Sequence, residues 1–337
     1  MRLPPEPRAN PELVGHDAAA ARLAEAARSG RLHHAWLLAG PAGIGKATLA
    51  FRFARWLLAG MPPDVAGKPP LFVPETDPVF RRITAGGHAD LMVLAPEIGA
   101  GRVRRQIPVD EARKVPRFLS LTSAEGGFRI VLLDEAETMH PGAANALLKT
   151  IEEPSNSTVL LVVSHVAASL LPTLRSRMRR LDLAPLAEPA MQGLLGRWLP
   201  EMPAADRAQL GRVAAGSPGR ALALAEGEGL SLATEAVRLL AAMPRPDERA
   251  WFALADRLAA VRDGSAFTLF WALLRARLAS ALAEAARGNA EPWLEGRPLA
   301  EWSEAWSRIG AQARRTEALA LDRKQSSLAM LGWLAGR

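Results

Sequence analysis

The sequence predicts an α/β P-loop fold: a parallel sheet with helices on both faces, followed by two helical domains. A glycine-rich loop lies between an apolar run, Ala35–Ala39, and a helical pattern, Thr48–Ala59. Further apolar runs alternate with helical patterns as far as residue 183, and this alternation is typical of a parallel sheet covered by helices. Strand signals then vanish, and helical periodicity continues to the end of the sequence.

The elements of the sheet domain follow from apolar runs and helical periodicity. We expect strands at Ala35–Ala39, Leu91–Leu94, Arg129–Leu133, Thr158–Val163 and Arg180–Leu183, and helices at Ala18–Ser29, Thr48–Ala59, 109–121, His140–Glu153 and Leu170–Met178. Prolines break residues 60–78, and Arg102, Arg104 and Arg105 mark a basic loop at 96–106. Breaks at Gly216–Gly219 and Met243–Pro246 divide the helical part. The domains are therefore predicted at 1–185, 186–240 and 241–337.

Composition limits the class of protein. Of the 337 residues, 49% are hydrophobic and 23% are charged, which excludes a disordered chain. The sequence has no cysteine, so disulfides, thiolate zinc sites and cysteine nucleophiles are excluded, and a cytoplasmic location is expected. We find no signal peptide and no run near the roughly 18 apolar residues of a membrane span, so we expect no membrane association.

The net charge is +7. This charge favours an acidic partner such as nucleic acid. Solvated arginines in an arginine-rich chain explain it equally well. Charge alone leaves both interpretations open.

The loop Gly40–Thr48 reads G-P-A-G-I-G-K-A-T. In a phosphate-binding loop, backbone N–H groups wrap a phosphate, the lysine reaches the β/γ oxygens, and a Ser or Thr hydroxyl holds Mg²⁺. Here Ala47 takes the place of that hydroxyl, and Thr48 comes one residue late, turned by about 100° along the helix. The expected nucleotide contacts are Gly40, Gly43, Gly45, Lys46, Ala47 and Thr48. ATP or ADP is the expected cofactor, with weak or absent Mg²⁺ and little hydrolysis.

A second motif, Val131–Glu137, is an apolar strand that ends in acids. In P-loop ATPases such an Asp holds Mg²⁺ and the next Glu polarises the attacking water. Asp134 is therefore a predicted nucleotide-site residue and Glu135 a predicted catalytic one. Ser164, after the Thr158–Val163 strand, is a further predicted nucleotide contact. The alternative is a strand end with solvated acids.

Two arginines complete the set of candidates. At helical spacing, Arg177 can point out of one subunit, and a guanidinium offered to a neighbour's γ-phosphate acts as an arginine finger. Arg220 lies in the first turn of a helix begun by Ser217-Pro218. A cation is unfavourable there unless an anion binds nearby. The alternative for Arg177 is a solvated basic helix end.

The six histidines show no metal-ligand spacing, so no metal site is predicted.

These motifs together resemble the clamp-loader branch of the AAA+ ATPases, and within it the delta-prime subunits of bacterial DNA polymerase III. The resemblance rests on five stretches: Leu32–Ala47, Ile107–Arg113, Asn145–Pro154, Leu171–Arg177 and Leu321–Gln325. It implies a helical lid at 186–240 and a collar, or oligomerisation, domain at 241–337. It also implies a five-subunit ring with delta and gamma/tau partners that places a sliding clamp on primer-template DNA.

The resemblance also assigns roles. The triplet Ser176–Met178 retains the arginine that this family offers across the subunit interface, although Met178 replaces the usual cysteine. Zinc-binding cysteines that relatives often carry are absent, so no zinc is expected. The favoured hypothesis is a weak or inactive ATPase that supplies Arg177 in trans. The alternatives are an active gamma/tau-type ATPase and, last, a stand-alone nucleic-acid-binding protein.

Overall fold

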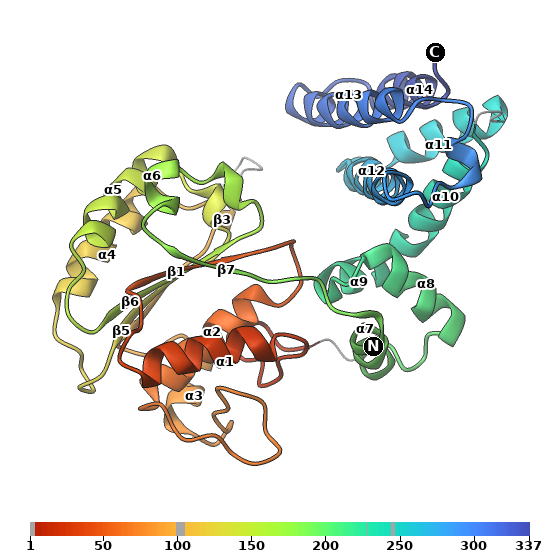
Figure 1. The fold of residues 1–337 in the computed structure, drawn as a ribbon. Helices are drawn as coiled ribbons and strands as arrows, with labels where there is room; N and C mark the ends of the chain where they lie inside the picture. The colour runs from red at the N-terminus through yellow and green to blue at the C-terminus, as the bar shows by residue number, and fades with distance from the viewer. Residues whose placement is uncertain (1–3, 99–104, 227, 244–246) are drawn as a thin grey trace. The chain divides into compact units, whose positions relative to one another are not determined.

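A computed structural model describes residues 4–98, 105–226, 228–243 and 247–337. The chain divides into two compact units, residues 1–220 and 221–337 (Figure 1). The first unit contains the sheet and the helices that cover it, together with a small group of helices. The second unit is entirely helical within the residues described.

The central sheet is parallel and has five strands. They are β1 (Ala35–Ala39), β2 (Leu91–Leu94), β5 (Arg129–Leu133), β6 (Thr158–Ser164) and β7 (Arg179–Asp182), in the order β2-β5-β6-β1-β7. Strands β1, β5 and β6 are completely buried, because helices cover both faces and leave their apolar runs no solvent-exposed side. Two short strands, β3 (Glu97–Ile98) and β4 (Arg105–Gln106), form a separate antiparallel pair.

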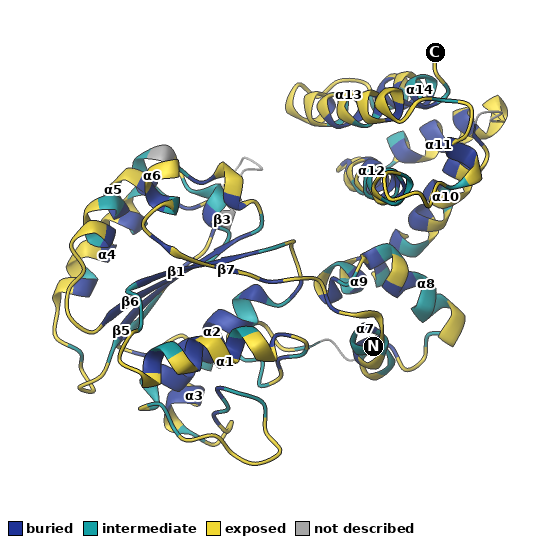
Figure 2. Cartoon of the chain, viewed as in Figure 1, coloured by how far each residue is buried: buried dark blue, intermediate teal, exposed yellow. Residues whose placement is uncertain are grey.

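Helices cover both faces of the sheet, as Figures 1 and 2 show. One face carries α1 (Asp17–Arg28), α2 (Lys46–Leu58) and α3 (Pro78–Thr84), which pack with Leu38, Leu132 and Leu161 in one apolar core. The other face carries α4 (Val109–Ser120), α5 (Pro141–Glu152) and α6 (Pro172–Arg175), with the alternate strand residues in a second core. Short 3₁₀ helices lie at Ala136–Thr138 and Ala167–Ser169. Side chains alternate along each strand, so each face receives every second residue.

Two side chains of α2, Arg52 and Trp56, bond to the proline-rich stretch after that helix, and Arg52 also bonds to the segment before α1. Arg52 donates to the carbonyl oxygens of Pro70, at 2.8 Å, and Pro11, at 2.8 Å. Trp56 Nε1 donates to Pro62 O at 2.9 Å. These bonds satisfy backbone carbonyls of irregular segments.

Three helices follow the sheet, and the second unit begins within the third. They are α7 (Glu188–Trp198), α8 (Ala204–Ala214) and α9 (Pro218–Ala225). The second unit continues with α10 (Gly229–Ala241), α11 (Glu248–Ala260), α12 (Ser265–Ala285), the 3₁₀ helix Pro292–Leu294, α13 (Leu299–Ala318) and α14 (Arg323–Leu334). Its core includes Trp271, Leu274 and Trp302, large apolar side chains that pack between helices.

Helix α12 is long and apolar enough to cross a membrane by length and composition. Its side chains Phe267, Phe270 and Trp271 are buried within the second unit, as expected for the core helix of a helical domain. Length and composition are weak evidence that α12 crosses a membrane, since core helices of soluble proteins meet the same criteria.

The predicted fold class is confirmed, and the five strands begin and end within one residue of their predicted bounds. Sequence reasoning missed α3 and the pair β3–β4. Arg102 and Arg104 of the predicted basic loop lie outside the described residues. The boundaries at 185 and 240 stay a prediction.

Candidate functional site

The candidate phosphate loop lies at the carboxyl edge of the sheet. It runs from the end of β1 to the start of α2, and Gly45 caps that helix with a φ of 103°, a conformation that favours glycine. Strand β6 lies beside β1, with Ala39 in register with Ser164. Asp134 directly follows β5, the next strand along. The fold therefore brings the loop, Asp134 and Ser164 together, as the sequence predicts.

Four consecutive carbonyl groups of the loop accept hydrogen bonds from the chain itself. Lys46 Nζ donates to Pro41 O at 2.5 Å, and Ser217 Oγ donates to Ala42 O at 2.8 Å. The N–H of Gly219 donates to Gly43 O at 2.9 Å. His16 Nε2 donates to Ile44 O at 2.7 Å. The loop is thus fixed from three sides, by α1, by its own lysine and by the start of α9.

The start of α9 packs directly on the loop. A Cβ atom built on Gly43 would lie 2.6 Å from Ser217 Oγ and 3.1 Å from Gly219 Cα, and the φ of Gly43 is 73°. Conversely, a Cβ on Gly219 would lie 2.9 Å from Gly43 Cα. Two glycines therefore permit an approach of backbone to backbone that no other residue type allows.

Lys46 is almost completely buried, with 3% of its surface exposed. Burial lowers the pKa of its ammonium to about 8, against the opposing influence of the Glu137 and Asp134 carboxylates. Its one hydrogen bond within the described residues goes to Pro41 O. A lysine in this position serves phosphate oxygens when a nucleotide binds, and here a backbone carbonyl takes their place.

Glu137, to which the sequence analysis assigned no role, links the segment after β5 to the end of β6 through hydrogen bonds. Its carboxylate accepts a hydrogen bond from Ser164 Oγ at 2.9 Å and from the N–H of His165 at 3.1 Å. His165 Nδ1 lies 2.7 Å from Glu137 Oε1. Burial alone raises the pKa of Glu137, but the bonds from His165, the backbone and Ser164 outweigh it and lower the pKa to about 2. The Ser164 hydroxyl, a predicted nucleotide contact, donates to this carboxylate.

The two predicted Mg²⁺-associated acids lie just beyond β5. Asp134 accepts a hydrogen bond from the N–H of Glu135 at 2.9 Å, and burial raises the pKa of its carboxyl. Glu135 has φ 47° and ψ 49°, a left-handed conformation that costs about 1–3 kcal/mol in a residue other than glycine. Such strain often marks functional sites. Both acids therefore lie where the sequence places them.

The residues present fit a phosphate better than they fit a metal ion. The loop backbone and Lys46 supply the groups that hold a phosphate at a helix N-terminus. Ala47 and Thr48, both half-buried, begin α2, and Ala47 offers no oxygen for Mg²⁺. Among the residues described, no group of three or more His, Cys, Asp or Glu side chains is placed to hold a metal.

Arg220 lies in the first turn of α9, half-buried, and its N–H donates to Ser217 Oγ at 3.2 Å. In the described part of the chain, its guanidinium makes no hydrogen bond or ion pair. Burial lowers the pKa of this guanidinium. A half-buried cation without a counter-ion next to the loop is consistent with the predicted anion contact.

Arg177 lies apart from the loop, after α6. Its Nη1 donates to Thr173 O at 2.8 Å, and its Nη2 lies 2.9 Å from Glu152 Oε1, at the end of α5. The side chain remains 41% exposed. This arginine therefore lies apart from the phosphate loop, with part of its guanidinium exposed.

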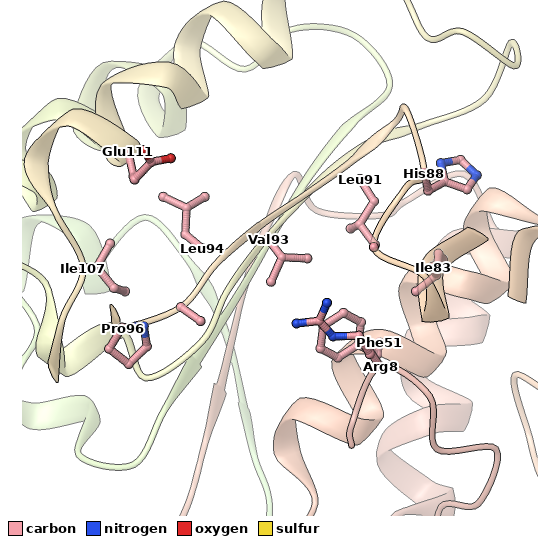
Figure 3. Close-up of a pocket in the computed structure, with 12 residues that line it drawn as sticks. Arg8, Phe51, Ile83, His88, Leu91, Val93, Leu94, Pro96, Ile107 and Glu111 are labelled. Carbon is pink, nitrogen blue, oxygen red and sulfur yellow. The ribbon is translucent and has the colours of Figure 1, made fainter. Parts of the chain in front are cut away.

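A cavity of about 360 Å³ lies elsewhere, beside the edge strand β2 (Figure 3). Twelve residues line it, among them Phe51, Val93 and Glu111. None of them is a predicted site residue. The cavity is therefore separate from the candidate nucleotide site.

Comparison with known families now identifies the chain. The family model described as DNA polymerase III, delta subunit matches residues 15–187, which is more than half of the sequence. The chain belongs to this family. The matched region contains the sheet, the phosphate loop and Arg177.

Curated relatives agree with the family match. The chain is 40% identical to DNA polymerase III subunit delta' of Pseudomonas aeruginosa over 55% of its length, and 34% identical to that of Escherichia coli over 61%. These alignments span 53% and 59% of the two relatives' own lengths. DNA polymerase III subunit gamma/tau of Mycobacterium bovis is 30% identical, over 55% of this chain and 30% of that protein.

Proposed function

We propose that this chain is a delta-prime-like subunit of the clamp loader of DNA polymerase III, which helps place a sliding clamp on primer-template DNA. In this proposal it supplies Arg177 to the ATP site of a neighbouring gamma/tau subunit. Its own pocket hydrolyses ATP weakly or not at all. It works in the cytoplasm, in a ring of five subunits that also contains delta.

The observation that carries the proposal is the contrast between Arg177 and the loop. The Arg177 guanidinium is oriented and accessible, and an arginine finger supplied in trans accelerates hydrolysis by about 10³–10⁵. The loop lacks the Mg²⁺ hydroxyl, because Ala47 stands at the position of the usual Ser or Thr. These features favour a role in trans.

Nucleotide binding without efficient hydrolysis fits the same pocket. ATP or ADP would be held by the loop backbone, Lys46 and Arg220. Lys46 would then exchange its bond to Pro41 O for one to phosphate. Glu135 would have no well-held Mg²⁺ beside it.

The alternative is an active gamma/tau-type ATPase. Lys46, Asp134 and Glu135 favour it, since P-loop ATPases use these residue types in these motifs. Ala47 and the engagement of Ser164 by Glu137 oppose it.

Reconstitution tests the proposal. Delta, gamma/tau and the sliding clamp are mixed with and without this chain, and clamp loading on primed DNA is measured. The chain alone should hydrolyse almost no ATP, and loading should require it. Loading at full rate without the chain, or ATP turnover by the chain alone at about 1 s⁻¹ or more, would contradict the proposal.

A further inference from the structure

The end of α5 carries two acids with no assigned role. Glu152 is the last residue of the helix and Glu153 is its C-cap. Both belong to the run Asn145–Pro154 that carries the family resemblance. Carboxylates are unfavourable at a helix C-terminus, because the carbonyl ends of the helix are already partly negative. Two acids at this position therefore call for a local partner or a function.

Glu152 has such a partner, and it is Arg177. Glu152 Oε1 lies 2.9 Å from Arg177 Nη2, while Arg177 Nη1 donates to Thr173 O at 2.8 Å and to Ser176 Oγ at 3.4 Å. The guanidinium is thus held at both terminal nitrogens. One anchor comes from α5 and the other from α6, two helices that pack against each other. A planar group fixed at two points has a defined direction.

The anchoring leaves part of the guanidinium available. A guanidinium has five N–H donors. The Nε–H and one proton of Nη2 have no partner in the described part of the chain, and the side chain is 41% exposed. An approaching phosphate can therefore bind these donors while Glu152 and Thr173 still hold the opposite side.

We propose that Glu152 is a positioning residue for Arg177: it orients the guanidinium for the neighbour's γ-phosphate without touching nucleotide. This inference rests on the proposed role of Arg177 in trans. An exposed ion pair adds only about 0–1 kcal/mol to stability. Its contribution lies in orientation, since a catalytic group held in its reacting geometry reacts faster than one that must find it.

The effect should appear in the rate of hydrolysis and not in binding. Without Glu152, Arg177 keeps its charge and its bond to Thr173 O but loses the second anchor. The turnover number kcat at the neighbouring site should fall about tenfold, while KM for ATP stays unchanged. The variant Glu152→Gln keeps an acceptor oxygen without the charge, so its kcat should fall between wild type and Glu152→Ala.

The test uses the reconstituted complex in which the other ATP sites are inactivated, so that hydrolysis reports only the site beside Arg177. Glu153→Ala is the matched control, because Glu153 adjoins Glu152, is likewise exposed, and forms no ion pair within the described residues. It should leave kcat unchanged. Thermal unfolding of each variant shows whether the chain remains folded.

A double variant decides whether Glu152 acts through Arg177. If it does, Glu152→Ala should slow the wild type but not Arg177→Ala, since the positioned group is already gone. The inference fails if Glu152→Ala matches or exceeds wild-type kcat while Arg177→Ala is slow, or if the two losses multiply. If Arg177→Ala is itself as fast as wild type, the proposed function fails as well.

Discussion

The phosphate loop and the Arg177 region differ in how far other groups of the same chain bind their polar groups. In the loop, the chain supplies a donor to each carbonyl from Pro41 to Ile44, and Lys46 is buried against one of them. At Arg177, the guanidinium is anchored on one side and exposed on the other. Both regions use cationic groups suited to phosphate.

A phosphate-loop motif in the sequence is therefore not by itself evidence that the loop takes part in catalysis. The loop retains the glycines and lysine of a nucleotide site, and bonds to its carbonyl oxygens hold it in place, but Ala47 supplies no hydroxyl for Mg²⁺. The Arg177 side chain is bound by Glu152 and Thr173 on one side and is 41% exposed, so under the proposed function it is available to a phosphate of a neighbouring subunit. The proposed function therefore assigns the loop a structural or binding role and assigns the catalytic contribution to Arg177.

We expect the largest loss of stability from a substitution that disrupts the contact between the loop and α9. Gly43→Ala forces a residue other than glycine into a φ of 73° and brings a Cβ to 2.6 Å from Ser217 Oγ. We expect a loss of about 2–4 kcal/mol in the free energy of unfolding, from backbone strain plus overpacking. Urea unfolding followed by tryptophan fluorescence measures it.

Gly60→Ala is the matched control for that change. Its φ is 78°, and a Cβ there meets nothing within 4 Å, so only the backbone strain of about 1 kcal/mol remains. Equal losses in the two variants would mean that α9 does not pack on the loop.

Removal of the Glu137 charge should have a smaller effect. Glu137→Gln weakens the bonds from Ser164 and His165, and should cost about 1–3 kcal/mol at pH 7. Because the folded pKa of about 2 is below the usual 4.5, this stability is present above pH 4.5 and is lost as the pH falls toward 2.

Acid titration of the two proteins measures that dependence. The wild type should lose its advantage over Glu137→Gln between pH 4.5 and 2. Glu153→Gln is the control, since this exposed carboxylate accepts no such hydrogen bonds in the described part of the chain. A pH-independent difference between wild type and Glu137→Gln would show that the carboxylate is not held as described.

The pH dependence contributed by Lys46 is the subtlest expected effect. Its folded pKa of about 8 is below the usual 10.5, so the unfolded chain binds an extra proton between these values. Stability contributed at this site should therefore rise with pH from about 8 to 10.5. Unfolding of wild type and Lys46→Met at pH 7 and pH 9.5 tests this. If the difference in unfolding free energy between wild type and Lys46→Met is the same at both pH values, the Lys46 ammonium is exposed to solvent and not buried as described.

Sequence patterns located the sheet and much of the candidate site, for physical reasons. Strands such as β5 are buried on both faces, and this gives an uninterrupted apolar run. Lys46 and Asp134 follow directly from such strands and a glycine loop. Helix α3 was missed because it is only seven residues long and follows directly on the proline-rich stretch, with Pro78 as its first residue.

The contacts that close the loop could not be predicted from local patterns. Ser217 bonds to Ala42 across 175 positions, and His165 meets Glu137 across 28. Their pairing depends on which strand ends the fold brings together. The acid Glu137, two residues after Asp134-Glu135, was visible in the sequence, but its partners were not.

One paired measurement tests the central claim that the chain acts through Arg177 and not through its own loop. Lys46→Ala and Arg177→Ala are each placed in the complex, and hydrolysis at the neighbouring subunit's ATP site is followed in a single turnover. We predict a loss of about 10³-fold for Arg177→Ala and wild-type hydrolysis for Lys46→Ala. The reverse result, a large loss for Lys46→Ala and none for Arg177→Ala, would contradict the account.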